Sequence, residues 1–292
     1  MMQAFHKPPW IKTRLPGAGM YSEVKRVLRN HRLHTVCEEA LCPNLGECWG
    51  GGTATIMILG DICTRGCRFC AVKSGNPMGL IDQSEPENVA HAVKELNLTY
   101  VVLTSVCRDD LPDGGATVYA ETVRAIKELN SDVLVEVLIP DFNGRKEHVK
   151  KVVDSHPDVI AHNVETVRRL TPLVRDRRAS FDQSLTVLKT VKELDSSIYT
   201  KSSIMVGLGE TREEVVEAMR ELRAADVDFI TIGQYLRPTL THIPVVEYVH
   251  PSVFDFYRQE ALKLGFKYAA CGPLVRSSYR AGEFYVKTVL GR

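Results

Sequence analysis

Six of the eight cysteines form two triplets within a 34-residue stretch of the sequence. The first triplet is Cys37, Cys42 and Cys48, and the second is Cys63, Cys67 and Cys70. Three thiolates on one short loop can each bind one corner of a four-iron cluster, and they leave the fourth iron without a protein ligand. An open metal position separates a reactive site from a structural one, as it does at zinc sites. The two triplets therefore predict two [4Fe–4S] clusters and a site that carries out chemistry.

Two less reactive explanations of the cysteines compete with this one. A disulfide framework is typical of small secreted domains, whereas this chain has 292 residues, is 44% hydrophobic and is long enough for a large core. Its first ten residues also lack the apolar segment of a signal peptide. Structural zinc favours paired C-x2-C knuckles, and neither triplet supplies two of them. A zinc-binding scaffold or interaction protein stays open as an alternative, which assays for iron and acid-labile sulfide would separate from a cluster enzyme.

The charge balance excludes other classes of function. Lys and Arg number 37 against 36 Asp and Glu, a net charge of +1, so the sequence has no electrostatic footprint for nucleic acid. No apolar run approaches the roughly 18 residues that a membrane-spanning helix needs. We therefore expect a soluble, cytoplasmic protein without a nucleic-acid or membrane partner.

After residue 53, short apolar runs alternate with longer amphipathic segments. The candidate strands are 54–60, 100–105, 133–139, 158–163, 198–206 and 228–233. The helical patterns between them are 86–96, 116–130, 145–155, 181–194 and 211–225. Val- and Ile-rich runs bounded by polar turns are typical of parallel strands buried on both faces. The repetition predicts a parallel α/β sheet, either a barrel or an open doubly wound sheet, and its six units are two fewer than a complete eight-fold barrel has.

The two flanks differ from this repeating region. Residues 1–53 form an N-terminal extension with a helical pattern at 21–30 and the first triplet, and residues 54–250 form the repeating region. Residues 251–292 form a C-terminal extension with a helix at 253–264 and a strand-like segment at 267–270. We expect both extensions to pack onto the sheet. Since ligands of such folds gather at the carboxyl ends of the strands, the second triplet, which follows the first strand, lies at the functional rim.

The second triplet has the spacing C-x3-C-x2-C with Phe69 before its last cysteine, and in this it resembles the radical S-adenosylmethionine superfamily. The first triplet, C-x4-C-x5-C, and the segment Arg276–Tyr279 make the chain similar to the lipoyl synthase family in particular. Further matching stretches are 9–10, 38–44, 108–115 and 233–239. The resemblance runs nearly from end to end. With it, the expected fold is a partial parallel (β/α)6 barrel of the TIM type, with the two extensions packed on it.

The resemblance implies insertion of two sulfur atoms at C6 and C8 of an octanoyl group that is bound to a lysine of a lipoyl carrier domain. The second triplet would hold the cluster that cleaves S-adenosylmethionine to a 5'-deoxyadenosyl radical, because unactivated C–H bonds are beyond acid–base chemistry. The first triplet would hold an auxiliary cluster that gives up its sulfide. Biotin synthase and methylthiotransferases are alternatives, against which the first triplet and the C-terminal serine motif argue.

The same resemblance implies partners. The substrates would be octanoylated carrier domains of the 2-oxoacid dehydrogenase complexes and the H protein of the glycine cleavage system. A low-potential electron donor such as ferredoxin or flavodoxin would reduce the radical cluster. An iron–sulfur carrier would rebuild the consumed cluster.

The auxiliary cluster has a fourth iron that needs a ligand. Residue types alone favour Cys107 or Cys271, but the resemblance assigns Ser278, which we count with Cys63, Cys67 and Cys70 as catalytic. An alkoxide is a hard ligand on a soft site, and such a weak ligand suits a cluster that must open during turnover. Cys107 and Cys271 are then expected to be ordinary buried thiols.

Polar residues near strand ends are the expected cofactor contacts: Thr104, Asn163, Glu165, Ser203, Glu210 and Gln234. Thr104 ends the second strand, where the superfamily holds the methionine amine, although the usual Gly-Gly-Glu pattern is absent. Asn163 and Glu165 are candidates for the ribose, with helix capping as the alternative for Asn163. The segment 203–210 loosely follows a cofactor-contact pattern, and a plain strand-to-helix turn with Glu210 at a helix start is the equal alternative.

Two polar loops complete the candidates. The loop 108–115 contains three acids and two glycines, more than a solvated turn needs, and is assigned to cofactor or substrate positioning. The basic run 175–178 is expected to be a solvated face. A docking surface for an acidic carrier domain is the alternative for that run.

Overall fold

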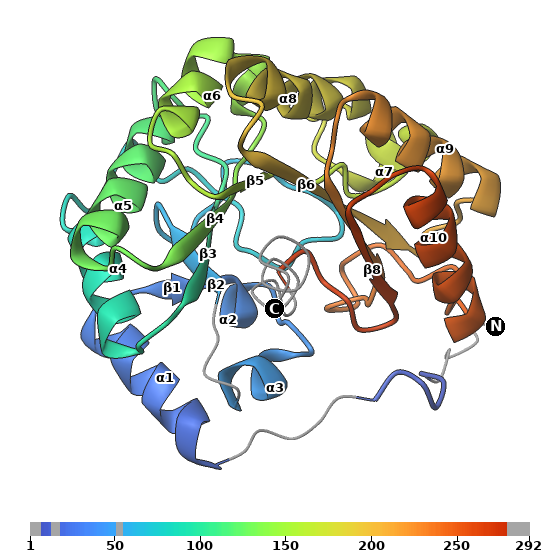
Figure 1. Ribbon diagram of the computed structural model, residues 1–292. Coiled ribbons are helices and arrows are strands. Elements are labelled where there is room, and N and C mark those ends of the chain that lie inside the picture. Colours follow the sequence, from blue (N-terminus) through green and yellow to red (C-terminus); the bar gives the residue numbers. More distant parts are fainter. Residues whose placement is uncertain (1–6, 13–17, 51–54, 279–292) are drawn as a thin grey trace.

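Eight strands form one sheet, and their order in space is their order in the sequence, from β1 to β8. The structure is a computed structural model, and it describes residues 7–12, 18–50 and 55–278. β1 pairs antiparallel with β2, and every later pair of neighbours is parallel. Figure 1 shows the sheet as an arc with the long helices on its outer side and α2 and α3 between its two ends. Within these residues no strand pairing joins β8 to β1, so hydrogen bonds do not close the barrel.

The strands are β1 His34–Thr35, β2 Thr55–Ile58, β3 Tyr100–Ser105, β4 Leu134–Leu138, β5 Val159–Ala161, β6 Tyr199–Val206, β7 Phe229–Gln234 and β8 Tyr268–Gly272. The helices are α1 Ala18–Asn30, α2 Val36–Glu39, α3 Leu45–Gly50, α4 Glu85–Glu95, α5 Ala116–Leu129, α6 Lys146–Val153, α7 Thr171–Val174, α8 Phe181–Leu194, α9 Arg212–Ala224 and α10 Pro251–Lys263. Short 3-10 turns, η1 Phe142–Gly144 and η2 Arg168–Leu170, precede α6 and α7. In the described part of the chain, no helix combines the length and apolar character needed to cross a membrane.

The expected fold class is confirmed, and the helix and the strand-like segment expected in the C-terminal extension are present as α10 and as β8, which extends the parallel sheet. The six candidate strands correspond to β2–β7, and the five helical patterns between them correspond to α4, α5, α6, α8 and α9. The C-terminal segment adds α10 and β8, which pairs parallel with β7. The two-residue strand β1 was not expected.

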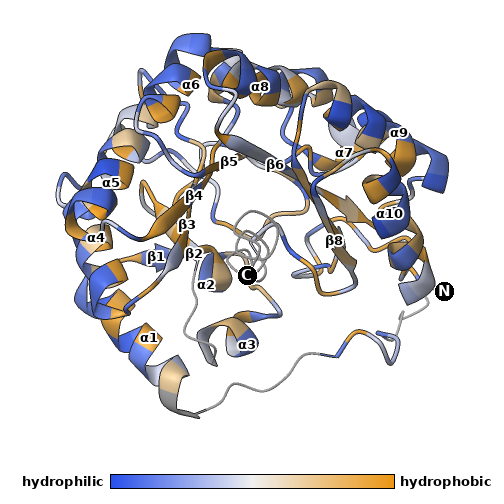
Figure 2. Ribbon diagram, viewed as in Figure 1, coloured by the Kyte–Doolittle hydropathy of each residue, from blue (hydrophilic) through white to orange (hydrophobic). Residues whose placement is uncertain are grey.

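Local sequence explains why these elements form where they do. The inner strands have few exposed residues, and β2 and β7 are buried along their whole length, as strands covered on both faces must be. Thr211 and Glu214 form a reciprocal capping box that starts α9, and Ser180 caps α8 by accepting from the amide of Gln183. In Figure 2 the outer helices are hydrophilic toward solvent and hydrophobic toward the sheet. The strand ends are therefore held rigidly enough to position a site.

Candidate active site

One cavity lies inside the arc and receives side chains from the loops that follow the strands. Its volume is about 1660 Å3, and its walls include all six cysteines of the two triplets. Apolar side chains such as Met57, Val102 and Leu138 line it together with polar ones. The two triplets, separate in sequence, thus share one chamber that is large enough for a cofactor and an acyl chain.

The first triplet is held by two short helices. Thr35 caps α2 by accepting from the amide of Glu38 at 3.3 Å, and this places Cys37 in the first turn. The Cys42 amide donates to the carbonyl of Cys37 at 3.0 Å, while Cys48 lies in α3. Burial raises the pKa of Cys37 to about 11 and that of Cys48 to about 12. These thiols stay protonated until a metal displaces the proton.

The C-terminal segment lies against this triplet. Asn44 donates from Nδ2 to the carbonyl of Leu274 at 2.6 Å. Thr55 donates from Oγ1 to Ser278 Oγ at 2.8 Å, and the Thr55 amide hydrogen-bonds Cys37. Ser278 and Cys37 therefore share Thr55 as a neighbour, although they are far apart in the sequence. Ser277 and Ser278 both line the cavity.

The second triplet occupies the loop after β2, and its backbone is tied at both ends. The Cys63 amide donates to the carbonyl of Lys73 at 2.8 Å, which closes the loop on itself. The Cys70 amide donates to the carbonyl of Cys67 at 3.1 Å. His242 donates from Nε2 to the carbonyl of Cys70 at 2.9 Å. The loop is thereby fixed before any metal binds.

The three sulfurs of this loop sit in different electrostatic surroundings. A hydrogen bond from the Cys107 thiol outweighs burial and, with the amides of Arg65 and Cys107, lowers the pKa of Cys63. Burial raises the pKa of Cys67 and raises that of Cys70 to about 12. Cys63 is thus the thiol of the loop that ionises most readily.

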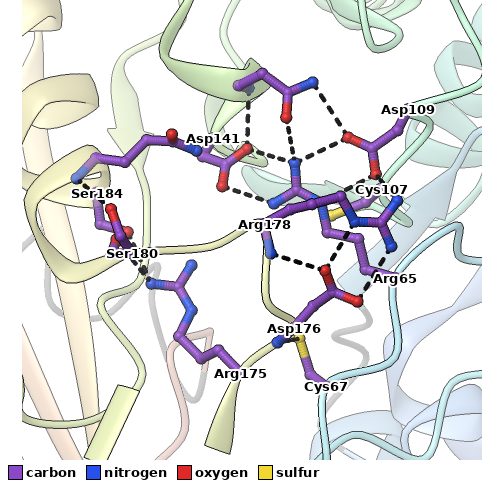
Figure 3. Close-up of polar contacts among 12 residues, drawn as sticks. Arg65, Cys67, Cys107, Asp109, Asp141, Arg175, Asp176, Arg178, Ser180 and Ser184 are labelled. Carbon is purple, nitrogen blue, oxygen red and sulfur yellow. Dashed lines mark hydrogen bonds and ion pairs between the residues drawn. The ribbon is translucent and has the colours of Figure 1, made fainter. Parts of the chain in front are cut away.

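A buried ion-pair network surrounds Arg65, which lies between two of these cysteines (Figure 3). Its guanidinium makes bidentate hydrogen bonds to Asp141 at 2.6 and 2.7 Å and to Asp109 at 3.0 and 2.9 Å. It also donates to Asn143 Oδ1 at 3.0 Å. Asp109 follows β3 and Asp141 follows β4, so Arg65 anchors the cysteine loop to the ends of two further strands. Paired donors of this kind are strong and directional.

A second clamp comes from the segment after α7. Asp176 accepts from the Gly66 amide at 2.9 Å, and its own amide donates to Cys67 Sγ at 3.3 Å. Arg178 pairs with Asp176 at 2.8 Å and donates to the carbonyl of Thr64 at 2.7 Å. The expectation of a solvated basic face is wrong for Arg175, which is 8% exposed, because its guanidinium points inward to the hydroxyl of a buried serine.

Five of the six expected cofactor contacts line the cavity: Thr104, Asn163, Glu165, Ser203 and Gln234. Asn163 donates from Nδ2 to Glu165 Oε1 at 3.1 Å, and its buried Oδ1 has no partner among the described residues. Glu165 has a φ of 67°, a strained value for a residue with a Cβ. Its backbone is held there by hydrogen bonds to Ser203 and Met205 at 3.1 and 2.8 Å.

Two of the six candidates, Glu210 and Gln234, hydrogen-bond to backbone groups. Glu210 lies outside the cavity wall, and its carboxylate accepts from the amides of Gly207 and Leu208, which matches the strand-to-helix turn. Gln234 is 1% exposed, and its amide group donates to three carbonyls and accepts from the Val249 amide at 2.8 Å. Glu210 therefore shapes a loop behind the cavity, whereas Gln234 holds backbone groups at the cavity wall itself.

An ion pair on the inner face of the sheet forms a polar patch beside the cavity. Lys201 Nζ lies 2.7 and 3.0 Å from the two carboxylate oxygens of Glu136, and their side chains are 5% and 2% exposed. Tyr100, which lines the cavity, donates to Glu136 at 2.6 Å. Buried pairs of this kind add little net stability, but breaking one is costly.

Sequence patterns did not identify Arg65 or Asp141 as parts of the site, and they offered Cys107 only as a candidate fourth cluster ligand, which the resemblance replaced by Ser278. Arg65 lies inside the cysteine motif, which was a signal for its importance, but nothing in the sequence indicates its partners. Cys107 was expected to be an ordinary thiol, yet its amide donates to Cys63 Sγ at 3.4 Å. The loop 108–115 does position the site, since Asp109 holds both Arg65 and Thr64.

The donor set fits iron–sulfur clusters. Each triplet offers three soft thiols to the cavity, and such ligands select iron–sulfur clusters or zinc. Among residues 7–12, 18–50 and 55–278, no three His, Cys, Asp or Glu side chains converge on a point that could hold a single metal ion. The unpartnered oxygen of Asn163 offers an acceptor for a cofactor hydroxyl.

Comparison with known proteins identifies the family. The model of the Radical SAM superfamily matches residues 57–222, and that of the N-terminal domain of lipoyl synthase matches residues 2–42. A lipoyl synthase of Thermus thermophilus is 57% identical over 282 residues, which are 97% of this chain and 87% of that protein. This chain belongs to the lipoyl synthase family. The resemblance read from the cysteine motifs is thereby confirmed.

Other lipoyl synthases agree with this placement. That of Anaeromyxobacter sp. is 56% identical, and the match covers 96% of this chain and 95% of the relative. The apicoplast lipoyl synthase of Plasmodium knowlesi is 55% identical, but this chain spans only 64% of its length. Membership in the radical SAM superfamily implies a [4Fe–4S] cluster and S-adenosylmethionine.

Solved structures show the fold at much lower identity. Methylornithine synthase has a TM-score of 0.55 at 16% identity, with 85% of this chain and 67% of that chain covered. A maturase of [FeFe]-hydrogenase has a TM-score of 0.57 at 15% identity, with 72% and 49% covered. These structural similarities support the barrel fold of this lipoyl synthase family member. They give no information about its substrate.

Proposed function

We propose that this chain inserts two sulfur atoms at C6 and C8 of an octanoyl group carried on a lysine of a lipoyl carrier domain. The observation that carries this proposal is that both cysteine triplets and Ser278 line the same cavity. A radical site and a sulfur source must face one acyl chain, because a carbon radical has to meet sulfur where it forms. The family membership supports the same reaction.

In this proposal Cys63, Cys67 and Cys70 hold the radical [4Fe–4S] cluster, and Cys37, Cys42, Cys48 and Ser278 hold the auxiliary one. When bound, the reduced radical cluster with S-adenosylmethionine supplies a 5'-deoxyadenosyl radical, and the auxiliary cluster supplies sulfide. The backbone hydrogen bonds of the loop from Cys63 to Cys70 hold the three thiols of the second triplet in fixed positions relative to one another. The position of Ser278 beside Thr55 and Cys37 supports its role as the fourth ligand of the auxiliary site.

The remaining polar groups orient the cofactor and the substrate. Asn163 and Glu165 would accept hydrogen bonds from the ribose hydroxyls of S-adenosylmethionine. Thr104 and Ser203 would contact its methionine part. Glu210 and Gln234 would act through the backbone they hold. The apolar side chains of the cavity would bind the octanoyl chain and exclude water from the radical.

The partners in this proposal are the octanoylated domains of 2-oxoacid dehydrogenase complexes and the H protein of the glycine cleavage system. A ferredoxin or flavodoxin would supply electrons, and an iron–sulfur carrier would restore the auxiliary cluster. All eight cysteines are free thiols, which supports a reducing compartment such as the cytoplasm.

A matched pair of variants tests which triplet holds the radical cluster and which holds the auxiliary cluster. An anaerobic reaction with an octanoyl-lysine peptide, S-adenosylmethionine and a reductant is read by mass, together with 5'-deoxyadenosine, iron and acid-labile sulfide. Cys67→Ala should lose 5'-deoxyadenosine formation and about half of the iron. Cys42→Ala should keep 5'-deoxyadenosine formation and lose sulfur insertion. Retained thiolation in Cys42→Ala would refute the sacrificial auxiliary cluster.

Ser278 has its own control in the neighbouring serine. Ser278→Ala should keep a cluster on the three cysteines but lose most sulfur insertion, whereas Ser277→Ala should be milder. Equal effects of the two changes would show that the assignment to Ser278 is wrong. If the wild-type protein contained zinc and no acid-labile sulfide, the proposal that it is an iron–sulfur enzyme would be rejected.

A further inference from the structure

Four positively charged side chains surround the loop of the second triplet outside the cavity: Arg68, Lys73, Arg177 and Arg178. All four residues are exposed, and none of them belongs to the cavity wall. The three cysteines of the same loop do line the cavity. The loop therefore presents its sulfurs to the cavity and this set of cations, the outer basic patch, to solvent.

Two cations of the outer basic patch are placed by the backbone of the cysteine loop. Arg68 is part of the loop, and its amide donates to the carbonyl of Val174 at 2.9 Å. The carbonyl of Lys73 accepts from the amide of Cys63 at 2.8 Å. The contacts that hold the cysteines therefore also fix the positions of these two charges.

The other two cations come from the segment after α7, which is anchored on the same loop. Asp176 accepts from the amide of Gly66 at 2.9 Å, and Arg178 donates to the carbonyl of Thr64 at 2.7 Å. Arg177 lies between these two anchored residues in the chain. Its charge is thereby held beside the loop.

Three of the four charges have no counter-charge. In the described ranges of the chain, Arg68, Lys73 and Arg177 form no ion pair. Arg178 does form one, with Asp176 at 2.8 Å, so the acid of this segment is already neutralised. Since the whole chain has a net charge of only +1, the unpaired positive charge is a local feature of this surface.

The loop leaves room for close approach at Gly66. This glycine is exposed, and a Cβ in its place would meet only Ser74 Oγ, at 3.9 Å. The next residue, Cys67, lines the cavity. A partner on the outer basic patch is therefore separated from the cysteine sulfurs by the loop itself and does not have to enter the cavity.

We propose that the outer basic patch docks the acidic one-electron carrier protein that reduces the radical cluster. One electron leaves the reduced carrier and enters the oxidised cluster, and no bond is formed or broken. The inference rests on the proposed function, because the second triplet must hold that cluster, and it adds the surface and the charge of the partner. A lipoyl carrier domain has to pass its acyl arm into the cavity, whereas an electron carrier only has to approach the loop.

Charge complementarity suits this kind of partner. Interfaces between electron-transfer proteins are small and weak, so they depend on rapid encounter more than on buried area. Opposite charges steer the encounter and raise association rates by roughly 10- to 1000-fold. This gain disappears as salt shortens the screening length, from about 10 Å at 0.1 M to about 3 Å at 1 M.

The test compares two reductants on the anaerobic holoenzyme with both clusters in place. One is reduced flavodoxin, an acidic protein, and the other is dithionite, which needs no docking surface. The patch variant carries Arg68→Gln, Lys73→Gln and Arg177→Gln, and it keeps Arg178 because that side chain anchors the loop. Stopped-flow absorbance follows cluster reduction, mass spectrometry follows 5'-deoxyadenosine, and calorimetry measures flavodoxin binding.

A control variant removes the same amount of charge elsewhere. It carries Arg124→Gln, Lys189→Gln and Arg212→Gln, at exposed positions of α5, α8 and α9. These three residues also form no ion pair within the described ranges. The two variants therefore differ in where the charge is removed and not in how much.

At low salt, flavodoxin should reduce the patch variant about tenfold more slowly than wild type and bind it about tenfold more weakly. Both differences should vanish near 1 M salt, at which the screening length is about 3 Å. With dithionite, the patch variant should match wild type in cluster reduction and in 5'-deoxyadenosine formation. The control variant should match wild type with both reductants.

Four results would overturn the proposal. One is flavodoxin-driven reduction of the patch variant at the wild-type rate in low salt. Another is an equal loss with dithionite, which would mean that the substitutions damage the loop itself. The third is an equal loss in the control variant, which would make the effect one of net charge. The fourth is a raised KM for an octanoylated carrier domain with unchanged flavodoxin kinetics, which would assign the patch to the substrate.

Failure of the proposed function looks different. Flavodoxin would still reduce the wild-type protein faster than the patch variant at low salt. However, the wild type would form no 5'-deoxyadenosine, or no thiolated product, with either reductant.

Discussion

Replacing Arg65 by methionine should loosen the loop of the second triplet. Arg65→Met keeps a long apolar stem but removes the guanidinium that pairs with Asp109 and Asp141. The three side chains are 4%, 17% and 1% exposed, so the carboxylate of Asp141 would be left in a water-poor site without a counter-charge, and Asp109 would keep only Arg178, at 3.3 Å. Breaking a buried pair costs about 3–5 kcal/mol, a large part of the roughly 5–15 kcal/mol that stabilises a protein. The thermal midpoint should fall by about 5–8 °C.

The pH dependence of this loss identifies its cause. Burial opposes ionisation of Asp109, but hydrogen bonds from Arg65 and Thr64 outweigh burial and lower its pKa from 3.8 to about 2. A lowered pKa in the folded state stabilises the fold above about pH 4, and that contribution disappears as the pH falls toward 2. The shift corresponds to roughly 2 kcal/mol at about 1.36 kcal/mol per unit, and Arg65 contributes the larger part of it beside Thr64 and Asn143. The free energies of unfolding of wild type and Arg65→Met should therefore approach each other by about this amount between roughly pH 5 and pH 2.

Urea unfolding of the reduced, cluster-free proteins at several pH values measures this difference, followed by circular dichroism and by the fluorescence of the buried Trp49. Arg220→Met is the control, because Arg220 and its partner Glu217 are 57% and 59% exposed and such surface pairs contribute little. A loss in Arg65→Met that does not depend on pH, or that is no larger than in Arg220→Met, would refute the reasoning.

Three further predictions concern residues around the cavity. Lys201→Met leaves the carboxylate of Glu136, 2% exposed, without its partner and should lower the free energy of unfolding by about 3–5 kcal/mol in urea titrations; a change below about 1 kcal/mol would contradict a buried ion pair. Gly207→Ala should lower the thermal midpoint more than Gly209→Ala, since both have positive φ but only a Cβ at 207 meets a buried side chain and a backbone oxygen; equal midpoints would contradict this. Asn163→Leu should weaken S-adenosylmethionine binding about tenfold in equilibrium dialysis, because it removes an unpartnered buried oxygen, and should lower the free energy of unfolding by about 1 kcal/mol, because it also removes the hydrogen bond from Nδ2 to Glu165; unchanged binding would remove Asn163 from the cofactor site.

Much of the barrel could be predicted because buried parallel strands leave a strong pattern. The runs at 100–105 and 228–233 agree with β3 and β7 to within a residue, because each is an apolar run that is bounded by polar turns. β1 could not be predicted, because two residues carry no period. α2 and α3 are also too short to show a helical period in the sequence, and they carry Cys37 and Cys48.

The site was predicted unevenly for physical reasons. The cysteine triplets follow from local spacing, which the sequence displays directly. The pairing of Arg65 with Asp141 depends on a contact between residues 76 positions apart, and no local pattern records such a contact. Glu210 and Gln234 are polar residues next to strand ends, but their side chains hydrogen-bond to backbone groups. The sequence alone does not show whether such a side chain binds backbone or is free to bind a ligand.

The contacts of Asn44 with Leu274 and of Thr55 with Ser278 join positions 230 and 223 apart, and this affects the order of maturation during synthesis. A ribosome that adds about 5–20 residues per second needs roughly 10–45 s to travel that distance. During this interval the first triplet is already translated but lacks the segment that covers it, whereas the acidic partners of Arg65 emerge within 76 residues. The loop of the second triplet can therefore form its Arg65 pairs early on a growing chain, and it gains its contacts with Asp176 and His242 later but still before residue 278 is made. Under the proposed assignment, the loop of the radical cluster would thus be complete before the auxiliary site, which receives Ser278 last.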